Sequence, residues 1–253
     1  MPEPTKPSLR PTLCPSLHEL GNMPYEQAYQ TQCDHHALVL GSRTSPVPEL
    51  GRILMVEHPP IITITKRPEA ASHVVASEAR LKEQGVTLHQ TDRGGDVTYH
   101  GPGQLVCYPI IDLNRAKLRI HDYIRLLENA IIDTLADYGI KSSTDPNATG
   151  VWINPKDNPT LHFENDQPAK IAAIGVRVRK WITLHGLSLN LNPNMAHYQL
   201  LVPCGLAGRP VTSVAQLLGE SKSPTRAQLA GILYTNISDH LDQNIETFSE
   251  TNG

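Results

Sequence analysis

Hydrophobic positions along the chain recur at intervals that predict two amphipathic helices. Apolar and aromatic residues lie three and four positions apart within 25–36 and again within 120–138, which is the spacing of one helix face. Pro24 lies just inside the start of the first predicted helix, and Gly139 ends the second. Two shorter patterns predict further helices over 212–219 and from Pro224 onward.

Runs rich in apolar and β-branched residues predict strands between these helices. The runs cover 53–58, 61–65, 86–91, 105–113, 150–154 and 171–192. The run at 105–113 is almost continuously apolar, which is typical of a strand buried on both faces. The run at 171–192 is long enough for two strands, and we expect His185-Gly186 to break its alternation.

The order of these elements predicts an α/β or α+β domain, a mixed sheet flanked by helices. Residues 155–169 are polar and rich in turn formers, so they are expected to form a surface loop. Residues 1–15 hold five prolines and no periodic pattern. We therefore expect a mobile N-terminal tail at 1–15 and a single catalytic domain at 16–253.

Composition narrows the class of protein. The 253 residues carry a net charge of −3, which gives no electrostatic reason to expect a nucleic acid or an anionic membrane as partner. No apolar run approaches the ~20 residues that cross a bilayer. The first ten residues lack the apolar segment of a signal peptide, so a cytoplasmic protein is expected. Four widely spaced cysteines form neither a disulfide framework nor a zinc pattern, so we expect no metal. The chain also lacks a Walker loop, and we expect no cofactor.

A glycine-rich segment, 93–104, is the first candidate for chemistry. Glycine serves where backbone turns sharply or approaches a ligand closely, and Arg93, Tyr99 and His100 add polar groups to this backbone. The segment lacks both the ending of a Walker A loop and the spacing of a dinucleotide fingerprint. A glycine-rich hairpin without any ligand explains the composition equally well.

Two further segments place reactive side chains beside apolar strands. Lys170 stands between the polar loop and the strand run. A surface role is the default for a lysine, but a lysine entering an apolar stretch loses hydration, which favours the neutral amine and suits it to act as a base. Cys204 lies in a Pro-Cys-Gly turn after an apolar run, where its sulfur can project into a cleft as a nucleophile. Cys107 lies within a strand and is expected to be structural, and a lone histidine such as His185 is more often structural than catalytic.

Several motifs in one order resemble the lipoate-pathway octanoyltransferases. They read EHPPIIT at 57–63, RGGDVTYHGPGQLVCYPI at 93–110, TGVWI at 149–153, KIAAIGVRV at 170–178, THGLSLN within 183–190 and PCGLAGRPVTSV at 203–214. The resemblance implies a fold similar to the catalytic domains of biotin and lipoate protein ligases. It implies transfer of an octanoyl group from octanoyl-acyl carrier protein to a lysine of lipoyl domains, the first step of protein lipoylation. The acceptors would be the lipoyl domains of 2-oxoacid dehydrogenases and the glycine cleavage H protein.

The resemblance also implies roles for individual residues. Cys204 would carry the acyl group as a thioester, and Lys170 would activate the thiol and handle protons. The walls of the acyl site would be Arg93, Gly94, Gly95, Asp96, Val97, Thr98, Tyr99, His100, Ala173, Ile174, Gly175, Gly186, Leu187 and Ser188. Members of the family usually carry alanine where this chain has Ser188, so one pocket contact differs.

Three other functions fit parts of the sequence. An adenylating lipoate or biotin ligase also uses a glycine-rich segment and a lysine, but it needs no nucleophilic thiol and would require ATP. A cysteine hydrolase would pair Cys204 with His185 or His100 and release free octanoate. A non-catalytic protein that binds acyl carrier protein would need neither Lys170 nor Cys204. The Pro-Cys-Gly turn favours the transferase.

Overall fold

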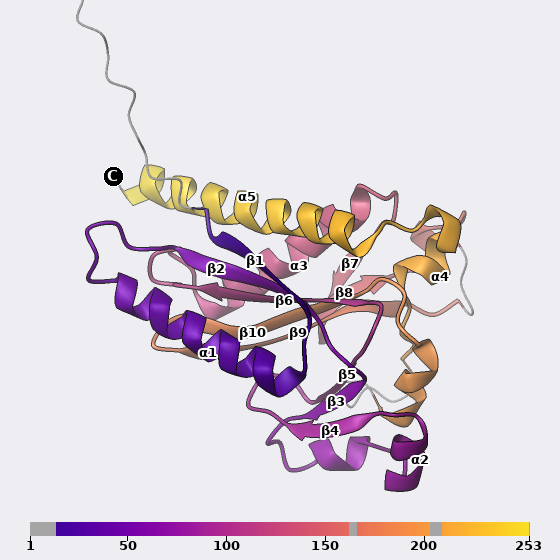
Figure 1. Ribbon diagram of the computed structural model, residues 1–253. Coiled ribbons are helices and arrows are strands. Elements are labelled where there is room, and N and C mark those ends of the chain that lie inside the picture. The colour runs from indigo at the N-terminus through magenta and orange to yellow at the C-terminus, as the bar shows by residue number, and fades with distance from the viewer. Residues whose placement is uncertain (1–13, 162–165, 203–208, 253) are drawn as a thin grey trace, which may run out of the picture.

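The computed structural model describes residues 14–161, 166–202 and 209–252. Within them, seven strands form one large sheet (Figure 1). Its order across the sheet is β1 (Ser16–Asn22), β2 (Gly51–Glu57), β6 (Gln104–Ile111), β10 (Ile182–Asn190), β9 (Ala169–Arg179), β8 (Ala148–Ile153) and β7 (Ser143–Asp145). The β1–β2 pair is parallel and the other neighbours are antiparallel. The prediction of a mixed sheet is confirmed.

A second, smaller sheet packs below the first in the view of Figure 1. It has the order β4 (Thr87–Gln90), β3 (Ile61–Ile64) and β5 (Val97–His100). Its apolar side chains form a separate core with α2 (Glu78–Glu83), in which Ile62, Tyr99 and Leu81 are buried. The sequence predicts β3 and β4 but not β5, because β5 lies inside the glycine-rich segment.

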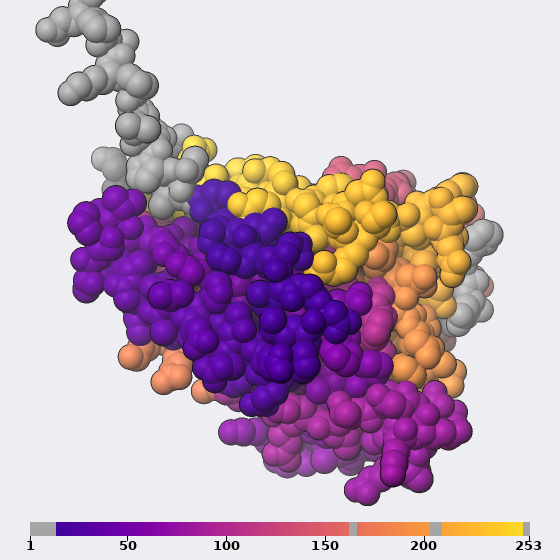
Figure 2. Space-filling model, in the orientation of Figure 1, coloured from indigo at the N-terminus to yellow at the C-terminus, as the bar shows by residue number. Residues whose placement is uncertain are grey.

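Helices cover both faces of the large sheet, as the predicted flanking helices require. On one face, α1 (Tyr25–Ser42) packs against β2, β6 and β10. On the other face lie α3 (Ile120–Ala136) and α5 (Arg226–Asn252), with the short α4 (Val214–Leu218) near the start of α5 (Figure 1). Figure 2 shows from the same side how β1 and α1 cover the front of the molecule. The apolar stripe of α3 is buried, and Gly139 follows its end with a φ of 72°.

Short 3₁₀ helices complete the described elements: η1 (Ala70–His73), η2 (Pro155–Asp157), η3 (Met195–Leu200) and η5 (Glu220–Lys222). The predicted surface loop at 155–169 thus begins with η2, and Ala169 already belongs to β9. None of the helices in the described part of the chain is long and apolar enough to cross a membrane.

The expected break at His185-Gly186 is wrong, since β10 runs through both residues. His185 pairs with Val176 and Gly186 with Gly175 across the β9–β10 ladder. His185 adopts a left-handed φ of 58°, which is unusual for a residue with a side chain. Its backbone N–H donates to Gln32 Oε1 of α1 at 2.7 Å. That bond satisfies the buried donor, so the strand continues in register with β9.

Candidate active site

A cavity lies where the smaller sheet meets the larger one, and it encloses about 440 Å³ of space that is partly open to solvent. Its walls come from α1, the glycine-rich segment, β6, β9 and β10. The lining residues are Tyr25, Arg93, Gly95, Asp96, Thr98, His100, Tyr108, Ala173, Ile174, Gly175, His185, Gly186, Leu187 and Ser188. The three sequence segments expected to form the acyl site therefore meet around one cavity.

The paired strands β9 and β10 form one wall of this cavity. Ala173 lies opposite Ser188 and Gly175 opposite Gly186 in the antiparallel ladder. Both glycines are required by close contacts. A Cβ on Gly186 would lie 2.2 Å from the carbonyl oxygen of Cys107, and one on Gly175 would lie 2.6 Å from the carbonyl oxygen of Gly94.

The glycine-rich segment forms the facing wall, and its alternation decides which side chains reach the cavity. Thr98 and His100 line it, whereas Val97 and Tyr99 turn into the core of the smaller sheet, as the two-residue period of a strand requires. Gly94 is not among the lining residues, and its backbone N–H donates to the carbonyl oxygen of Val176 at 3.0 Å. These contacts join the segment to β9.

Arg93 stabilises the segment from within. Its guanidinium donates to the carbonyl oxygens of Thr63, Gly94 and Asp96 at 2.9 to 3.1 Å and to the hydroxyl of Thr63. Several charge-assisted hydrogen bonds from one planar group fix the loop relative to β3. Arg93 therefore both borders the cavity and holds its wall in place.

Lys170 lies at the second position of β9, three residues before Ala173, and it is buried with 6% of its surface exposed. Its ammonium donates to the carbonyl oxygen of Thr149 at 3.0 Å and lies 4.8 Å from the ring centroid of Trp152. Both are contacts that an ammonium group makes with a hydrogen-bond acceptor and with an aromatic face. The predicted base thus sits on the same strand as part of the cavity wall, although it is not among the lining residues.

Cys204 lies outside the described residues, which stop at Val202 and resume at Arg209. The flanking residues are placed by backbone hydrogen bonds. The N–H of Val202 donates to His73 at 2.7 Å, and the N–H of Lys170 donates to Pro210 at 2.9 Å. Lys170 also receives a bond from the N–H of Thr212 at 2.9 Å. Pro210 and Thr212, which lie six and eight residues after Cys204 in sequence, are therefore bonded to the backbone of Lys170.

Three buried histidines around the cavity are uncharged at neutral pH. Burial lowers the pKa of His58 to about 4, and burial, then the neighbouring His58, lowers the pKa of His100 to about 3. Burial and then the charges of Arg93 and Arg177 lower the pKa of His185 to about 3. An ordinary histidine has a pKa near 6.5. The interior of the cavity is therefore compatible with an apolar ligand.

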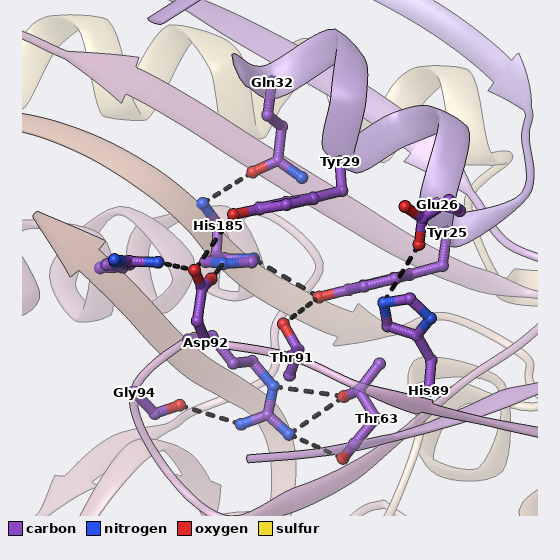
Figure 3. Close-up of polar contacts among 12 residues, drawn as sticks. Tyr25, Glu26, Tyr29, Gln32, Thr63, His89, Thr91, Asp92, Gly94 and His185 are labelled. Carbon is purple, nitrogen blue, oxygen red and sulfur yellow. Dashed lines mark hydrogen bonds and ion pairs between the residues drawn. The ribbon is translucent and has the colours of Figure 1, made fainter. Parts of the chain in front are cut away.

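A polar network holds His185 from three sides (Figure 3). Its Nε2 donates to Asp92 at 2.9 Å, and its Nδ1 lies 3.4 Å from the hydroxyl of Tyr25. Asp92 also forms an ion pair with Arg177, and the ring of Tyr29 stacks on His185 with 5.3 Å between centroids. With Nε2 bonded to a carboxylate, His185 is oriented by the fold, as a histidine in a structural role would be.

Sequence reasoning did not assign Tyr25, His58 and Tyr108 to the site. Tyr25 begins α1, and Tyr108 lies within the most apolar strand, so the pattern around each is that of a core residue. The one local signal is the phenol hydroxyl of Tyr108, which needs a partner when it is buried. That partner is His58 Nε2 at 2.7 Å, and fifty residues separate the two in sequence.

Comparisons with known proteins give the family. Residues 29–246 match the family described as the lipoyl protein ligase A/B catalytic domain. An octanoyltransferase of Christiangramia forsetii is 42% identical over 176 residues, which cover 70% of this chain and 71% of the relative.

Solved structures share the fold at low sequence identity. A bi-partite lipoate protein ligase of Thermoplasma acidophilum is similar with a TM-score of 0.65 and 16% identity over 90% of this chain and 84% of that one. A biotin protein ligase of Aquifex aeolicus is similar with a TM-score of 0.52 and 13% identity over 91% and 72% of the two chains. The expected likeness to the biotin and lipoate ligase fold is confirmed, and the sequence relatives show that the chain belongs to the octanoyltransferase family.

Proposed function

We propose that this octanoyltransferase works through a thioester on Cys204, with Lys170 as the group that exchanges protons with it. The donor would be octanoyl-acyl carrier protein. The acceptors would be the lysines of the lipoyl domains of 2-oxoacid dehydrogenases and of the glycine cleavage H protein. The observation that carries the proposal is the position of Lys170, a buried lysine whose backbone is bonded to Pro210 and Thr212, six and eight residues after Cys204 in sequence.

The first half-reaction loads the enzyme. The Cys204 thiolate, stabilised by the protonated Lys170, attacks the carbonyl carbon of the octanoyl thioester. A new carbon–sulfur bond to Cys204 forms and the bond to the carrier's sulfur breaks. The leaving thiolate takes the proton of Lys170, which leaves Lys170 neutral. The octanoyl chain lies in the cavity, whose histidines are uncharged.

The second half-reaction unloads it. The neutral amine of the acceptor lysine attacks the Cys204 thioester, forming a carbon–nitrogen bond and breaking the carbon–sulfur bond. The proton that the nitrogen loses passes to Lys170, so the thiolate–ammonium pair is restored. The restored ammonium donates to the carbonyl oxygen of Thr149, which lies 3.0 Å from Nζ.

The decisive experiment replaces each member of the pair. Cys204→Ser should abolish transfer, since a serine hydroxyl is far less acidic than a thiol. Intact mass of the wild-type enzyme after mixing with octanoyl-carrier protein should show one octanoyl group on Cys204. Cys33→Ser, a partly buried cysteine on α1, is the control and should retain activity. A Cys204→Ser enzyme that transfers octanoate at the wild-type rate would refute the covalent mechanism.

Lys170→Arg separates the two half-reactions. A guanidinium stays protonated at any working pH, so it can favour the thiolate but cannot accept a proton from the incoming amine. Acylation should persist at a reduced rate, while transfer to the lipoyl domain should fall by about two to four orders of magnitude. Single-turnover mass spectrometry follows both steps, with the exposed Lys222→Arg as control. An enzyme that loads slowly but unloads at the wild-type rate would show that Lys170 is an electrostatic partner only.

The same assay distinguishes the ligase alternative. A donor thioester is already activated, so the transferase needs no nucleotide, whereas acyl-adenylate chemistry needs ATP. Full activity without ATP, after dialysis against a chelator, supports the transferase. Strict dependence on ATP would contradict it.

A further inference from the structure

The cavity has an open end and a closed end. Gly95 at one side is exposed, and Ala173, Ile174 and Gly175 are partly exposed. Tyr108 lines the same cavity with only 3% of its surface exposed. The cavity therefore leads from β9 inward across β10 and closes at β6.

Two glycines leave the floor of this path without side chains. Gly175 on β9 lies opposite Gly186 on β10. Gly186 in turn approaches β6 closely, because a Cβ there would lie 2.2 Å from the carbonyl oxygen of Cys107 and 2.7 Å from Cδ of Pro109. Those two residues flank Tyr108, so Tyr108 carries the first large side chain met beyond the two glycines.

The length of this path matches an acyl chain of eight carbons. Neighbouring strands lie about 4.8 Å apart, so β9 and β6 are separated by about 10 Å. Seven carbon–carbon bonds of about 1.5 Å in an extended zigzag place the methyl carbon of an octanoyl group about 9 Å from its carbonyl carbon. A decanoyl group would extend about 2.5 Å farther, into the ring of Tyr108.

The closed end is held rigidly by hydrogen bonds. The hydroxyl of Tyr108 donates to His58 Nε2 at 2.7 Å, and His58 Nδ1 donates to the carbonyl oxygen of Met23 at 2.7 Å. The hydroxyl of Tyr25 is held by Thr91 at 2.8 Å. Because both phenol hydroxyls are bonded elsewhere, the closed end can meet the apolar end of a chain without losing a hydrogen bond.

We propose that Tyr108, supported by His58 and flanked by Tyr25, is the end wall that limits the acyl group to eight carbons. This inference rests on the proposed function, in which the cavity holds the acyl chain. It assigns the choice of chain length to one side chain on β6. The thiol and Lys170 take no part in that choice.

The test compares acyl donors on variants of Tyr108. Wild-type enzyme and the Tyr108→Ala, Tyr108→Leu and Tyr108→Phe variants are mixed with equal amounts of octanoyl- and decanoyl-carrier protein, and the acyl group on the enzyme is read by intact mass. Tyr108→Ala and Tyr108→Leu should raise the ratio of decanoyl to octanoyl adducts by about tenfold or more, because two further methylenes gain a buried site. Tyr108→Phe keeps the ring and should keep the wild-type ratio.

A matched control uses Tyr123, a buried tyrosine of α3 whose hydroxyl bonds to β6. The hydroxyl of Tyr123 on α3 donates to the carbonyl oxygen of Pro109 at 3.3 Å, and Tyr123 belongs to the core on the opposite face of the sheet. Tyr123→Leu should lower stability and leave the adduct ratio unchanged. Misfolding cannot produce a gain of decanoyl adduct. Tyr108→Leu keeps an apolar core residue, so it tests the inference even if Tyr108→Ala does not fold.

The outcomes separate the two proposals. If wild-type enzyme forms an octanoyl adduct on Cys204 and both Tyr108→Ala and Tyr108→Leu keep its chain preference, the end-wall inference is overturned and the proposed function stands. If wild-type enzyme transfers octanoate without any adduct, the thioester mechanism itself fails. If the decanoyl-to-octanoyl ratio rises in the Tyr108→Ala and Tyr108→Leu variants but not in Tyr123→Leu, the result supports both the end-wall inference and the proposed function.

Discussion

Lowering the pH from 7 to 5 should destabilise the protein through His58, and the sign follows from its surroundings. Burial lowers the pKa of His58 to about 4 in the folded protein, against 6.5 for an ordinary histidine. The unfolded chain therefore takes up a proton first as the pH falls. His58 contributes stability above pH 6.5, this contribution is lost progressively between pH 6.5 and about 4, and no more is lost below the folded pKa.

The size of the effect can be worked from that shift. At pH 5, about 1.5 units below the ordinary pKa of 6.5, His58 is protonated in the unfolded chain and mostly neutral in the folded protein. This difference lowers the unfolding free energy by about 2 kcal/mol from this one histidine. The pKa values of His100 and His185 are lowered for the same reason, so their contributions have the same sign. Because His58 and His100 interact, the three contributions are not expected to add.

Urea unfolding at pH 7 and pH 5, at equal ionic strength, measures the effect. Wild-type protein should lose stability between the two pH values, and His58→Gln should lose about 2 kcal/mol less, although it is less stable at pH 7. His121→Gln on the exposed side of α3 is the control and should behave as wild type. If His58→Gln loses as much stability as wild type on acidification, His58 is not a buried neutral group in the folded protein.

Two further predictions concern the surroundings of the site. Glu128 on α3 accepts a hydrogen bond from the N–H of Gly150 at 3.0 Å. Glu128→Ala should therefore lower the unfolding free energy by about 2 kcal/mol, because it leaves this donor unsatisfied, whereas Glu128→Gln keeps an acceptor and should lose less. Equal losses of stability in thermal unfolding would contradict this role. Cys107 is fully buried, and burial raises the pKa of its thiol well above the usual range, so alkylation of the folded protein at pH 8 should modify exposed Cys14 and leave Cys107 unmodified, as peptide mass mapping can check.

The sequence predicts the helices and strands whose apolar residues follow a regular local pattern. The apolar stripe of α3 and the continuous run of β6 both appear in the structure close to their predicted bounds. The strand β1 is not predicted, because it lies at the edge of the sheet and pairs with β2 alone, so most of its residues are exposed and its pattern is polar. An edge strand forms through its pairing with a neighbouring strand, and the residue pattern within the edge strand does not show that pairing.

The residues of the candidate site can likewise be predicted from the sequence only in part. The segments that contain Arg93, Lys170 and Gly186 stand out in sequence, since glycines and charged residues interrupt apolar runs. The contact between Tyr108 and His58 joins β6 to the residue that follows β2, and it cannot be deduced from either segment alone. The left-handed conformation of His185 likewise depends on Gln32 of α1, more than 150 residues earlier in the chain.

Two separate sets of contacts position the two halves of the proposed site, and this separation has a measurable consequence. The acyl path is bounded by Tyr108 and the cross-strand register of β9 and β10. The ammonium of Lys170 donates to the carbonyl oxygen of Thr149. The next residue, Gly150, donates its N–H to the carboxylate of Glu128 on α3. Effects of substitutions that share no partner are usually additive to within about 0.5 kcal/mol. A Tyr108→Leu, Glu128→Gln double variant should therefore show the chain preference of the first and the transfer rate of the second, measured in the same single-turnover assay. Marked non-additivity would mean that the end wall and the Lys170 anchor move together, through the shared strand β9.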